Sequence, residues 1–281
     1  MHDGRMPPVV SRRIRPVLST VLAGLLLSGC VPERVPVPSD TGVDRLGVKV
    51  VAEYPMDPGS FTQGFEYDGE RLLVGTGLHG DSRVYTSELG GAEIRSETLP
   101  DDLFGEGVTD TGSDIWQLTW KSGTAIRRDR ETLRETGRVP YPGEGWGLCS
   151  FADTVVMSDG TDQLRLLDPR DLRERSRIGV TVEGEPLDRL NELECVEGTD
   201  GRRTVLANVW MSETIVRVDT GTGVVDALVD ASGLHAPGSG DPDDTLNGIA
   251  RIPGTDRLLL TGKRWGVIYE VRLTDRPDPA G

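Results

Sequence analysis

The apolar residues of this chain occur in short runs, many of them rich in aromatic and β-branched residues, and turns rich in glycine and aspartate separate these runs. Residues 114–120, DIWQLTW, form one such run directly after the turn-like TDTGS. Runs of this length and composition are typical of β-strands. The few helix-like windows, such as DPRDLRERSRI, are short and mostly polar. Because no long stretch shows the 3.6-residue period of a helix, the pattern predicts an all-β protein.

Five stretches of the chain share one internal pattern. Each starts with a polar or aromatic residue and passes through a turn into an apolar strand, and the starts at residues 63, 106, 146, 191 and 247 are 43, 40, 45 and 56 residues apart. Further hairpins such as AIRRDRETLRE lie between them, and Asp129, Asp168 and Asp219 are predicted to begin their turns without any catalytic role. Four strands in a unit of about 40–45 residues are the sequence signature of a β-propeller blade.

Residues 46–274 are therefore predicted to form a five-bladed β-propeller. The early strand VKVVAEY, residues 48–54, has no complete blade of its own. It is expected to pair with WGVIYEVRL, residues 265–273, and so to close the last blade. Residues 275–281 are expected to form a disordered tail.

The first 30 residues are predicted to be a signal peptide. Arginines at positions 12, 13 and 15 precede an apolar run of 11 residues, 17–27, which is too short to cross a membrane. The run ends in LSGC, which resembles a bacterial lipobox and would make Cys30 the lipidated first residue of the mature protein. The alternative is an ordinary signal with a chance cysteine. Residues 31–45 contain three prolines and predict a semi-extended tether. The domain is thus expected to be extracytoplasmic and lipid-anchored to the bacterial cell membrane, at the cell surface or in the periplasm.

Charge and cysteine content narrow the range of partners. The chain has 31 Lys and Arg against 46 Asp and Glu, a formal net charge of −15. This excludes nucleic-acid binding and adhesion to anionic membranes, since both need a basic patch. Cys149 and Cys195 remain within the domain, where an oxidising compartment would permit a disulfide, although two buried free thiols fit the sequence at least as well. No exposed apolar seam is evident, so a monomer is expected.

Equivalent positions of the five stretches are expected to meet around the central channel, because the innermost strand of each blade lines it. A purely structural repeat would prefer one apolar residue at such positions, but two columns of equivalent residues differ from blade to blade. The first column holds Gln63, Glu106, Trp146, Asn191 and Asn247; the second, 14 to 19 residues later, holds Gly77, Trp120, Gly160, Trp210 and Lys263. This divergence predicts a binding pocket at one mouth of the channel, with Glu106 as its acid.

Eight short motifs occur in one order: FTQGF, FGEG, QLTW, GEGWGL, MSDG, LNELE, LNGIA and LTGKRW. Together they resemble the glutamine cyclotransferase family, of the plant-latex type of glutaminyl-peptide cyclotransferase, from about residue 54 to residue 273. The resemblance implies a five-bladed propeller and an acyltransferase that converts the N-terminal glutamine of peptides or proteins to pyroglutamate with release of ammonia. The family's pocket residues match this chain at Phe61, Thr62, Gln63, Glu106, Trp120, Trp146, Asn191, Trp210 and Lys263.

The chain departs from the family pattern around the first blade. Met56 stands where family members usually carry His, VGTG at 74–77 replaces ESTG, and His79–Gly80 replaces Tyr-Gly. Gly266 replaces the proline that usually follows GKRW. These changes put in question the size and polarity of that part of the pocket more than the chemistry.

The chemistry requires one group that takes a proton from the α-amine and returns it to the leaving ammonia. Glu106 is predicted to do so, with a pKa raised by the tryptophan walls. Lys263 is predicted to polarise the γ-carbonyl, directly or by holding Glu106. Gln63, Asn191 and Asn247 would recognise the carboxamide and the α-amine.

Alternative interpretations remain open at this point. Glu106 and Lys263 could be an ion pair that braces the channel, the tryptophans could belong to the core, and Asn191 and Asn247 could be turn residues. GTGLHG lacks the helix of a phosphate loop, and DGTDQ and GSGDPDD lack the spacing of a calcium loop. No cofactor is expected: the histidines stand at positions 2, 79 and 235, and neither domain cysteine has a nearby second ligand for zinc.

Two rival functions use the same fold. A non-catalytic propeller at the cell surface could bind peptides or small ligands at its tryptophan-lined mouth. Such a binder would gain little from keeping both Glu106 and Lys263. A propeller that processes sugars or lactones would need a metal cluster in the channel, which the sequence does not supply.

Overall fold

The computed structural model describes residues 42–234 and 241–275, and throughout these ranges the regular secondary structure consists of β-strands. The predicted all-β class is confirmed. No helix in the described part of the chain is long and apolar enough to cross a membrane. The predicted signal peptide with Cys30, the tether as far as residue 41 and the tail from residue 276 lie outside the described residues.

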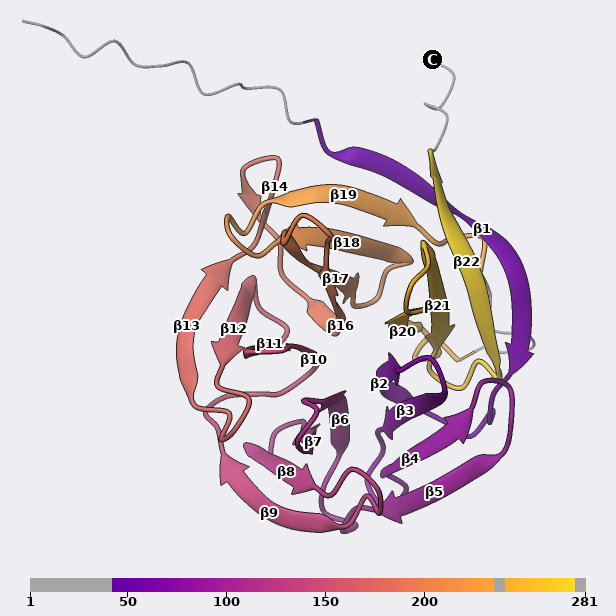
Figure 1. The fold of residues 1–281 in the computed structure, drawn as a ribbon, viewed down its shortest axis with the longest axis vertical. Coiled ribbons are helices and arrows are strands. Elements are labelled where there is room, and N and C mark those ends of the chain that lie inside the picture. The colour runs from indigo at the N-terminus through magenta and orange to yellow at the C-terminus, as the bar shows by residue number, and fades with distance from the viewer. Residues whose placement is uncertain (1–41, 235–240, 276–281) are drawn as a thin grey trace, which may run out of the picture. The chain divides into compact units, whose positions relative to one another are not determined.

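Three four-stranded antiparallel sheets follow one another along the chain, each with its strands hydrogen-bonded in sequence order (Figure 1). The first contains β2 (Thr62–Tyr67), β3 (Arg71–Thr76), β4 (Arg83–Glu88) and β5 (Glu93–Thr98). The second contains β6 (Gly105–Asp110), β7 (Ile115–Thr119), β8 (Thr124–Arg128) and β9 (Glu135–Pro140). The third contains β10 (Leu148–Phe151), β11 (Thr154–Ser158), β12 (Gln163–Leu167) and β13 (Glu174–Gly179). A small hairpin follows, made of β14 (Thr181–Val182) and β15 (Glu185–Pro186).

The remaining strands form one eight-stranded sheet. One half contains β16 (Leu190–Glu197), β17 (Arg203–Val209), β18 (Thr214–Asp219) and β19 (Val225–Asp230). The other contains β20 (Leu246–Arg251), β21 (Arg257–Gly262), β22 (Val267–Asp275) and the N-terminal β1 (Asp44–Pro55). As expected, β1 pairs antiparallel with β22, for example Val48 with Leu273. Residues 44–47 of β1 also pair in parallel with β19, which was not predicted. This second pairing covers the edge of β19, which would otherwise leave backbone groups unpaired.

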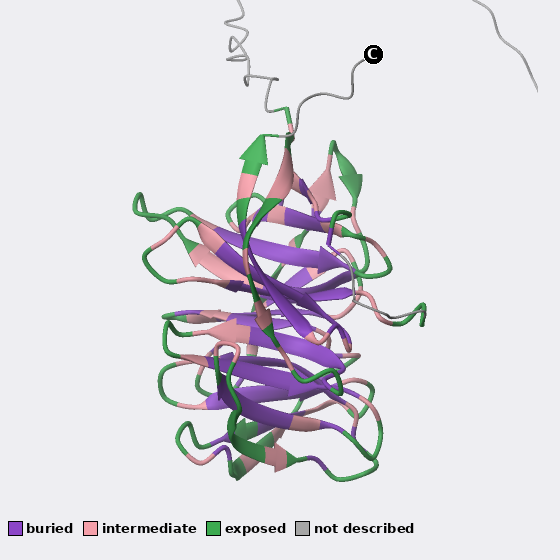
Figure 2. Cartoon of the chain, turned by 90° about the vertical axis from the view of Figure 1, so that its right-hand side faces the viewer, coloured by how far each residue is buried: buried purple, intermediate pink, exposed green. Residues whose placement is uncertain are grey.

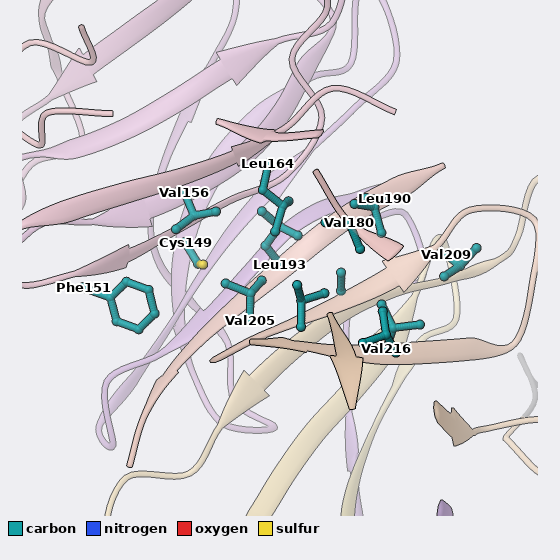
Figure 3. Close-up of a cluster of buried hydrophobic side chains, with 13 residues drawn as sticks. Cys149, Phe151, Val156, Leu164, Val180, Leu190, Leu193, Val205, Val209 and Val216 are labelled. Carbon is teal, nitrogen blue, oxygen red and sulfur yellow. The ribbon is translucent and has the colours of Figure 1, made fainter. Parts of the chain in front are cut away.

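The innermost strands of these sheets contact one another in a closed ring, β2 to β6, β6 to β10, β10 to β16, β16 to β20 and β20 back to β2. Figure 1 shows them around the centre of a propeller-like arrangement. Buried residues follow the strands, while the turns are mostly exposed (Figure 2). The core lies between neighbouring sheets. In the cluster of Figure 3, Phe151 and Val156 of the third sheet pack with Leu193 and Val205 of the next.

The middle of the channel is narrow. The residue after the first column is glycine in four of the five stretches, at Gly64, Gly107, Gly147 and Gly248. A Cβ on Gly107 would come within 2.5 Å of the Leu148 backbone nitrogen, so the strands can approach this closely only with glycine.

In the remaining stretch, which starts at Asn191, this position is Glu192, a fully buried residue. Its carboxylate accepts hydrogen bonds from the Phe65 backbone N–H of β2 at 3.2 Å and from the Ile249 backbone N–H of β20 at 2.8 Å. The side chain thus occupies the channel between three innermost strands. We made no prediction for this residue from the sequence.

Cys149 of β10 and Cys195 of β16 are joined by a disulfide, with their Cα atoms 5.4 Å apart. The bond links the innermost strands of two neighbouring sheets and settles the choice that the sequence left open. Cys149 packs in the buried cluster of Figure 3.

Replacing both cysteines by alanine is expected to lower the free energy of unfolding by about 3–4 kcal/mol, because the disulfide closes a loop with a sequence separation of 46 residues in the unfolded chain. Urea unfolding with and without reductant measures the effect. The reductant should destabilise the parent protein and leave the double variant unchanged. Equal unfolding midpoints for the oxidised parent and the variant would contradict the bond's stabilising role.

Candidate active site

A cavity of about 250 Å³ lies among the ends of the innermost strands. Drug-sized ligand pockets are about 300–1,000 Å³, so this cavity suits a single terminal residue rather than a long peptide segment. Eight of the ten predicted catalytic and substrate-binding residues line it: Phe61, Gln63, Glu106, Trp120, Trp146, Asn191, Trp210 and Lys263. Leu78, Phe104 and Asp243 complete the lining and were not predicted.

The first-column residues are positioned by the same local feature in four strands. Gln63, Glu106, Asn191 and Asn247 are each the second residue of their strand, at β2, β6, β16 and β20. The pairing register of each strand with its neighbour shifts at this point, for example between Thr62 and Gly64. Such a bulge redirects a side chain out of the regular ladder, and bulges are common beside active sites. The repeat therefore directs one side chain from each of these strands toward the channel mouth, and Gln63, Glu106 and Asn191 reach the cavity there.

Glu106 is buried, and its Oε2 atom has no hydrogen-bond partner. Burial raises its pKa well above the ordinary value, while the charge of Lys263 and a hydrogen bond from Gln63 act in the opposite direction. Glu144 raises the pKa further through its negative charge. A carboxylate with a free oxygen and a raised pKa is suited to accept a proton from a bound molecule.

Lys263 faces the same cavity from the end of β21. Burial lowers its pKa, and the charges of Glu106 and Asp243 partly oppose this shift. Its Nζ atom lies 4.9 Å from the centroid of the Phe61 ring. Within the described residues, Lys263 and Glu106 do not approach to the 4.0 Å of a salt bridge. The two charges thus face a shared space, which differs from an ion pair that braces the channel.

Asn191 lies against the cavity with its Oδ1 atom buried and without a hydrogen-bond partner. This acceptor is available to a bound molecule. Gln63 is also buried, and its Oε1 accepts a hydrogen bond from Asn247 Nδ2 at 3.1 Å. That bond fixes the orientation of the Gln63 amide and leaves its N–H groups for Glu106.

Thr62 and Asn247, both predicted to bind substrate, do not line the cavity. Thr62 directly precedes Gln63 in β2, and neighbouring residues of a strand point to opposite faces. Asn247 is fully buried, and its Nδ2 also donates to the Thr62 carbonyl at 2.9 Å. It therefore lies behind Gln63 and holds it, and its side chain bonds to the neighbouring strand rather than forming a turn.

The tryptophans divide into two groups. Trp116 and Trp265 are buried in the core, whereas the three predicted pocket tryptophans line the cavity and Trp210 remains 36% exposed. The rings of Trp146 and Trp210 meet edge to face with their centroids 5.5 Å apart. Aromatic contacts join Phe61 to Phe104 at 6.2 Å and Phe104 to Trp120 at 5.6 Å. The core interpretation thus holds for two tryptophans and not for the three of the pocket.

The glycines of the second column make room for these rings. A Cβ on Gly77 would collide with the Phe104 ring, and one on Gly160 would lie 2.6 Å from the Trp146 ring. Phe104 itself could have been found in the sequence, because it stands two residues before Glu106, as Phe61 stands two residues before Gln63. Each phenylalanine directly precedes its strand, β2 or β6, and the alternation of that strand extended by one residue places it on the same face as the cavity residue.

The departures from the family pattern lie mostly behind the pocket. Val74 is fully buried, Met56 packs against the same apolar cluster, and neither lines the cavity. His79 is exposed, and its ring lies 5.6 Å from that of Phe104. Gly266 has a φ of +66°, which proline cannot adopt. The local backbone at this position therefore differs from one that carries the usual proline.

Comparison with known proteins gives the same family. A family model described as glutamine cyclotransferase matches residues 21–273. The chain is 34% identical over 242 residues to a glutaminyl-peptide cyclotransferase of Arabidopsis thaliana, covering 83% of this chain and 73% of that protein. The structure is similar to that of Myxococcus xanthus glutaminyl cyclase, with a TM-score of 0.76 and 31% identity over 84% of this chain and 100% of that one. The motifs of the sequence and these matches agree, and the chain belongs to the glutamine cyclotransferase family.

Proposed function

We propose that this protein is a glutaminyl-peptide cyclotransferase, an acyltransferase that converts the N-terminal glutamine of peptides and proteins to pyroglutamate and releases ammonia. One observation carries the proposal. A buried carboxylate with a free oxygen, Glu106, and the ammonium of Lys263 face each other across a cavity suited to one residue. The names of the similar proteins from Arabidopsis thaliana and Myxococcus xanthus support the same reaction.

The reaction forms one C–N bond and breaks another. The α-amine nitrogen attacks the γ-carboxamide carbon, the Glu106 carboxylate accepts a proton from that nitrogen, and the carbonyl oxygen gains negative charge beside Lys263. Glu106 then returns the proton to the leaving amide nitrogen, which departs as ammonia as the lactam carbonyl re-forms. Because the attack is intramolecular, a folded conformation of the glutamine held by the aromatic walls supplies much of the rate.

Gln63 and Asn191 are proposed to hold the two reacting groups. The free Oδ1 of Asn191 can accept an N–H of the substrate, and Gln63 presents donors beside Glu106. Asn247 is proposed to act on Gln63 rather than on the substrate.

We propose that the fold is a five-bladed propeller. The three separate sheets, the β16–β19 half and the β20–β22 half with β1 supply the blades, and the closed ring of innermost strands supports this count. On this proposal β1 is the outer strand of the last blade.

We also propose that the protein is a monomer, lipid-anchored through Cys30 outside the cytoplasm, where it meets peptide and protein substrates. The lipobox-like LSGC and the proline-rich stretch that follows support the anchor. Labelling cells with a radioactive fatty acid tests it, because a Cys30→Ala variant should lose the label and leave the membrane fraction.

Ammonia release from a short glutamine-initiated peptide tests the function. The chain lacking residues 1–30 is expected to release ammonia and pyroglutamyl peptide, and since the proposed steps use Glu106 and Lys263 without a metal, a chelator should not stop it. A peptide that starts with asparagine is the matched control, because its shorter side chain would have to close a strained four-membered ring. A folded protein that binds the glutamine peptide without releasing ammonia would favour the alternative function, a cell-surface propeller that binds peptides or small ligands.

A further inference from the structure

Glu144 lies outside the cavity lining, in the turn between β9 and β10, and contacts two of the tryptophans that form the wall of the cavity. Its Oε2 atom accepts a hydrogen bond from Trp120 Nε1 at 2.8 Å and a second from Trp146 Nε1 at 3.1 Å. Trp120 directly follows β7 of one sheet, whereas Trp146 stands two residues before β10 of the next. One carboxylate oxygen thus bridges aromatic residues from two neighbouring sheets.

The backbone around Glu144 is held on both sides. The Gly145 N–H donates to the Trp120 carbonyl at 3.0 Å, and the Trp146 carbonyl accepts from the Gly107 N–H at 2.7 Å. The second carboxylate oxygen, Oε1, lies 3.7 Å from the ammonium of Lys121, which itself lies 3.9 Å from the centroid of the Trp120 ring. The carboxylate is therefore bound by two indole N–H groups and one cation.

This bridge reaches the rest of the wall through ring contacts. Trp146 packs on Trp210, and Trp120 packs on Phe104. The rings of Trp210 and Phe104 are therefore in contact with the two indoles that Glu144 holds. An indole N–H in a partly buried site needs a hydrogen-bond partner, and this partner sets the rotation of the ring. A reaction that depends on a folded substrate conformation loses rate when the surrounding walls are free to move.

We propose, on the basis of the proposed function, that Glu144 is a positioning residue: it holds Trp120 and Trp146 in one arrangement against the substrate glutamine. It does not touch the reacting atoms. Glu144 belongs to the GEGWGL motif but is not among the pocket residues that the family resemblance implied, although it stands two positions before Trp146, as Phe61 and Phe104 stand before Gln63 and Glu106.

The charge has a separate consequence from the hydrogen bonds. Among the described residues, the ionisable groups around Glu106 are Lys263, which lowers its pKa, Glu144, which raises it, and Tyr141, whose own pKa burial raises to about 12. Asp243 lines the same cavity. Since the active form of Glu106 is the carboxylate, activity should rise with pH through its raised pKa. Removing the charge at Glu144 lowers that pKa and moves the acid limb of the rate profile to lower pH.

Two substitutions distinguish these effects. Glu144→Gln keeps an acceptor oxygen for the indoles and removes the charge, while Glu144→Leu removes both. We expect Glu144→Gln to retain kcat/KM within about threefold at the plateau, with its acid limb shifted by several tenths of a pH unit. We expect Glu144→Leu to lose about 10- to 100-fold in kcat/KM, as for the loss of two hydrogen bonds to an ionised acceptor. The control is Glu135→Gln, which removes an exposed carboxylate paired with Arg138 on the same sheet and should change neither property.

Tryptophan fluorescence of the unliganded protein provides a readout that does not depend on catalysis. Loss of the carboxylate from two indole N–H groups should change the emission of Glu144→Leu more than that of Glu144→Gln, and Glu135→Gln should match the parent. Parent-like kinetics and emission in Glu144→Leu would overturn the proposal. If the acid limb of the rate profile does not move in Glu144→Gln, the role of the Glu144 charge is overturned. If the parent protein cyclises no glutamine peptide, the proposed function fails, while the emission still shows whether Glu144 holds the tryptophans.

Discussion

Replacing Glu106 by glutamine is expected to reduce kcat for ammonia release by about 10²- to 10⁴-fold, the usual contribution of a general acid–base group. The substitution keeps the size of the side chain and the contact with Gln63, but an amide cannot accept the proton of the attacking amine. The aromatic walls and Lys263 remain in place, so binding of the substrate should change much less than turnover.

The fold should tolerate this change. Burial raises the pKa of Glu106, which means that the charged form is disfavoured in the folded state, and a neutral glutamine removes that cost. The melting temperature of Glu106→Gln at neutral pH is therefore expected to equal or exceed that of the parent.

Glu66→Gln provides a matched control for Glu106→Gln. Like Glu106, Glu66 belongs to an innermost strand, in this case β2, and burial raises its pKa to about 7. It accepts hydrogen bonds from Thr109 and Asp110 and does not line the cavity. Its replacement should leave turnover near that of the parent. Parent-like kcat in Glu106→Gln would remove Glu106 from the mechanism. An equal loss in both variants would show that any buried glutamate of these strands supports activity indirectly.

Replacing Glu192 by alanine is expected to lower the free energy of unfolding by about 3–5 kcal/mol. The carboxylate satisfies the backbone N–H groups of Phe65 and Ile249, and each buried donor left unpaired costs about 1–3 kcal/mol. The loss of side-chain volume in the closely packed channel adds a cavity. Because these bonds join β16 to β2 and β20, the effect should extend across the ring of innermost strands.

Glu192→Gln distinguishes the hydrogen bonds from the charge. Burial is the main cause that raises the pKa of Glu192, and the charges of Glu194 and Glu66 raise it further. The hydrogen bonds from the backbone N–H groups of Ile249 and Phe65 lower it in part. The folded state thus binds the proton more tightly than the unfolded state. The stabilisation that comes from this tighter proton binding is complete below the ordinary glutamate pKa. It is lost as the pH rises through the raised pKa of Glu192 in the folded state. Glu192→Gln should weaken this dependence.

Urea unfolding of the parent, Glu192→Ala and Glu192→Gln at pH 5 and pH 8 measures both effects. The alanine variant should be the least stable at both pH values. Glu192→Gln should fall between the parent and the alanine variant at pH 5 and should change less than the parent between the two pH values. An alanine variant as stable as the parent would mean that the two N–H groups find other partners in the channel.

Much of the architecture could be predicted because it depends on local patterns. Strands are recognised by short apolar runs between glycine and aspartate turns, and the spacing of the repeats indicated a propeller. The pairing of residues 48–54 with β22 followed from counting the strands of each repeat. A strand left over at the N-terminal end of a closed set of repeats requires a partner at the C-terminal end. Local patterns could not predict the parallel pairing of β1 with β19, because that contact joins two sheets that the repeat treats as separate.

The pocket residues also divide into those that local patterns predict and those that depend on contacts between sheets. Equivalent positions of a repeat are brought to equivalent places, so the first and second columns identified Glu106, Lys263, Gln63, Asn191 and the three pocket tryptophans from the sequence alone. The family resemblance added Phe61. Asn247 belongs to the same column as Gln63 but lies behind it, because its side chain bonds to the backbone and side chain of β2 rather than to the cavity.

The sequence by itself thus determined the strands, their repetition, the family and most of the residues around the cavity. The tertiary structure decided which side chains reach across from one sheet to another: the Cys149–Cys195 bond, the capping of two strands by Glu192, and the bridge of Glu144 between two tryptophans. Most of these contacts join residues 24 to 127 positions apart, and the bond between Glu144 and Trp146 lies within one turn; all of them depend on side-chain direction and distance. Periodicity within one strand shows which face a side chain is on, but not which residue of another sheet lies within its reach.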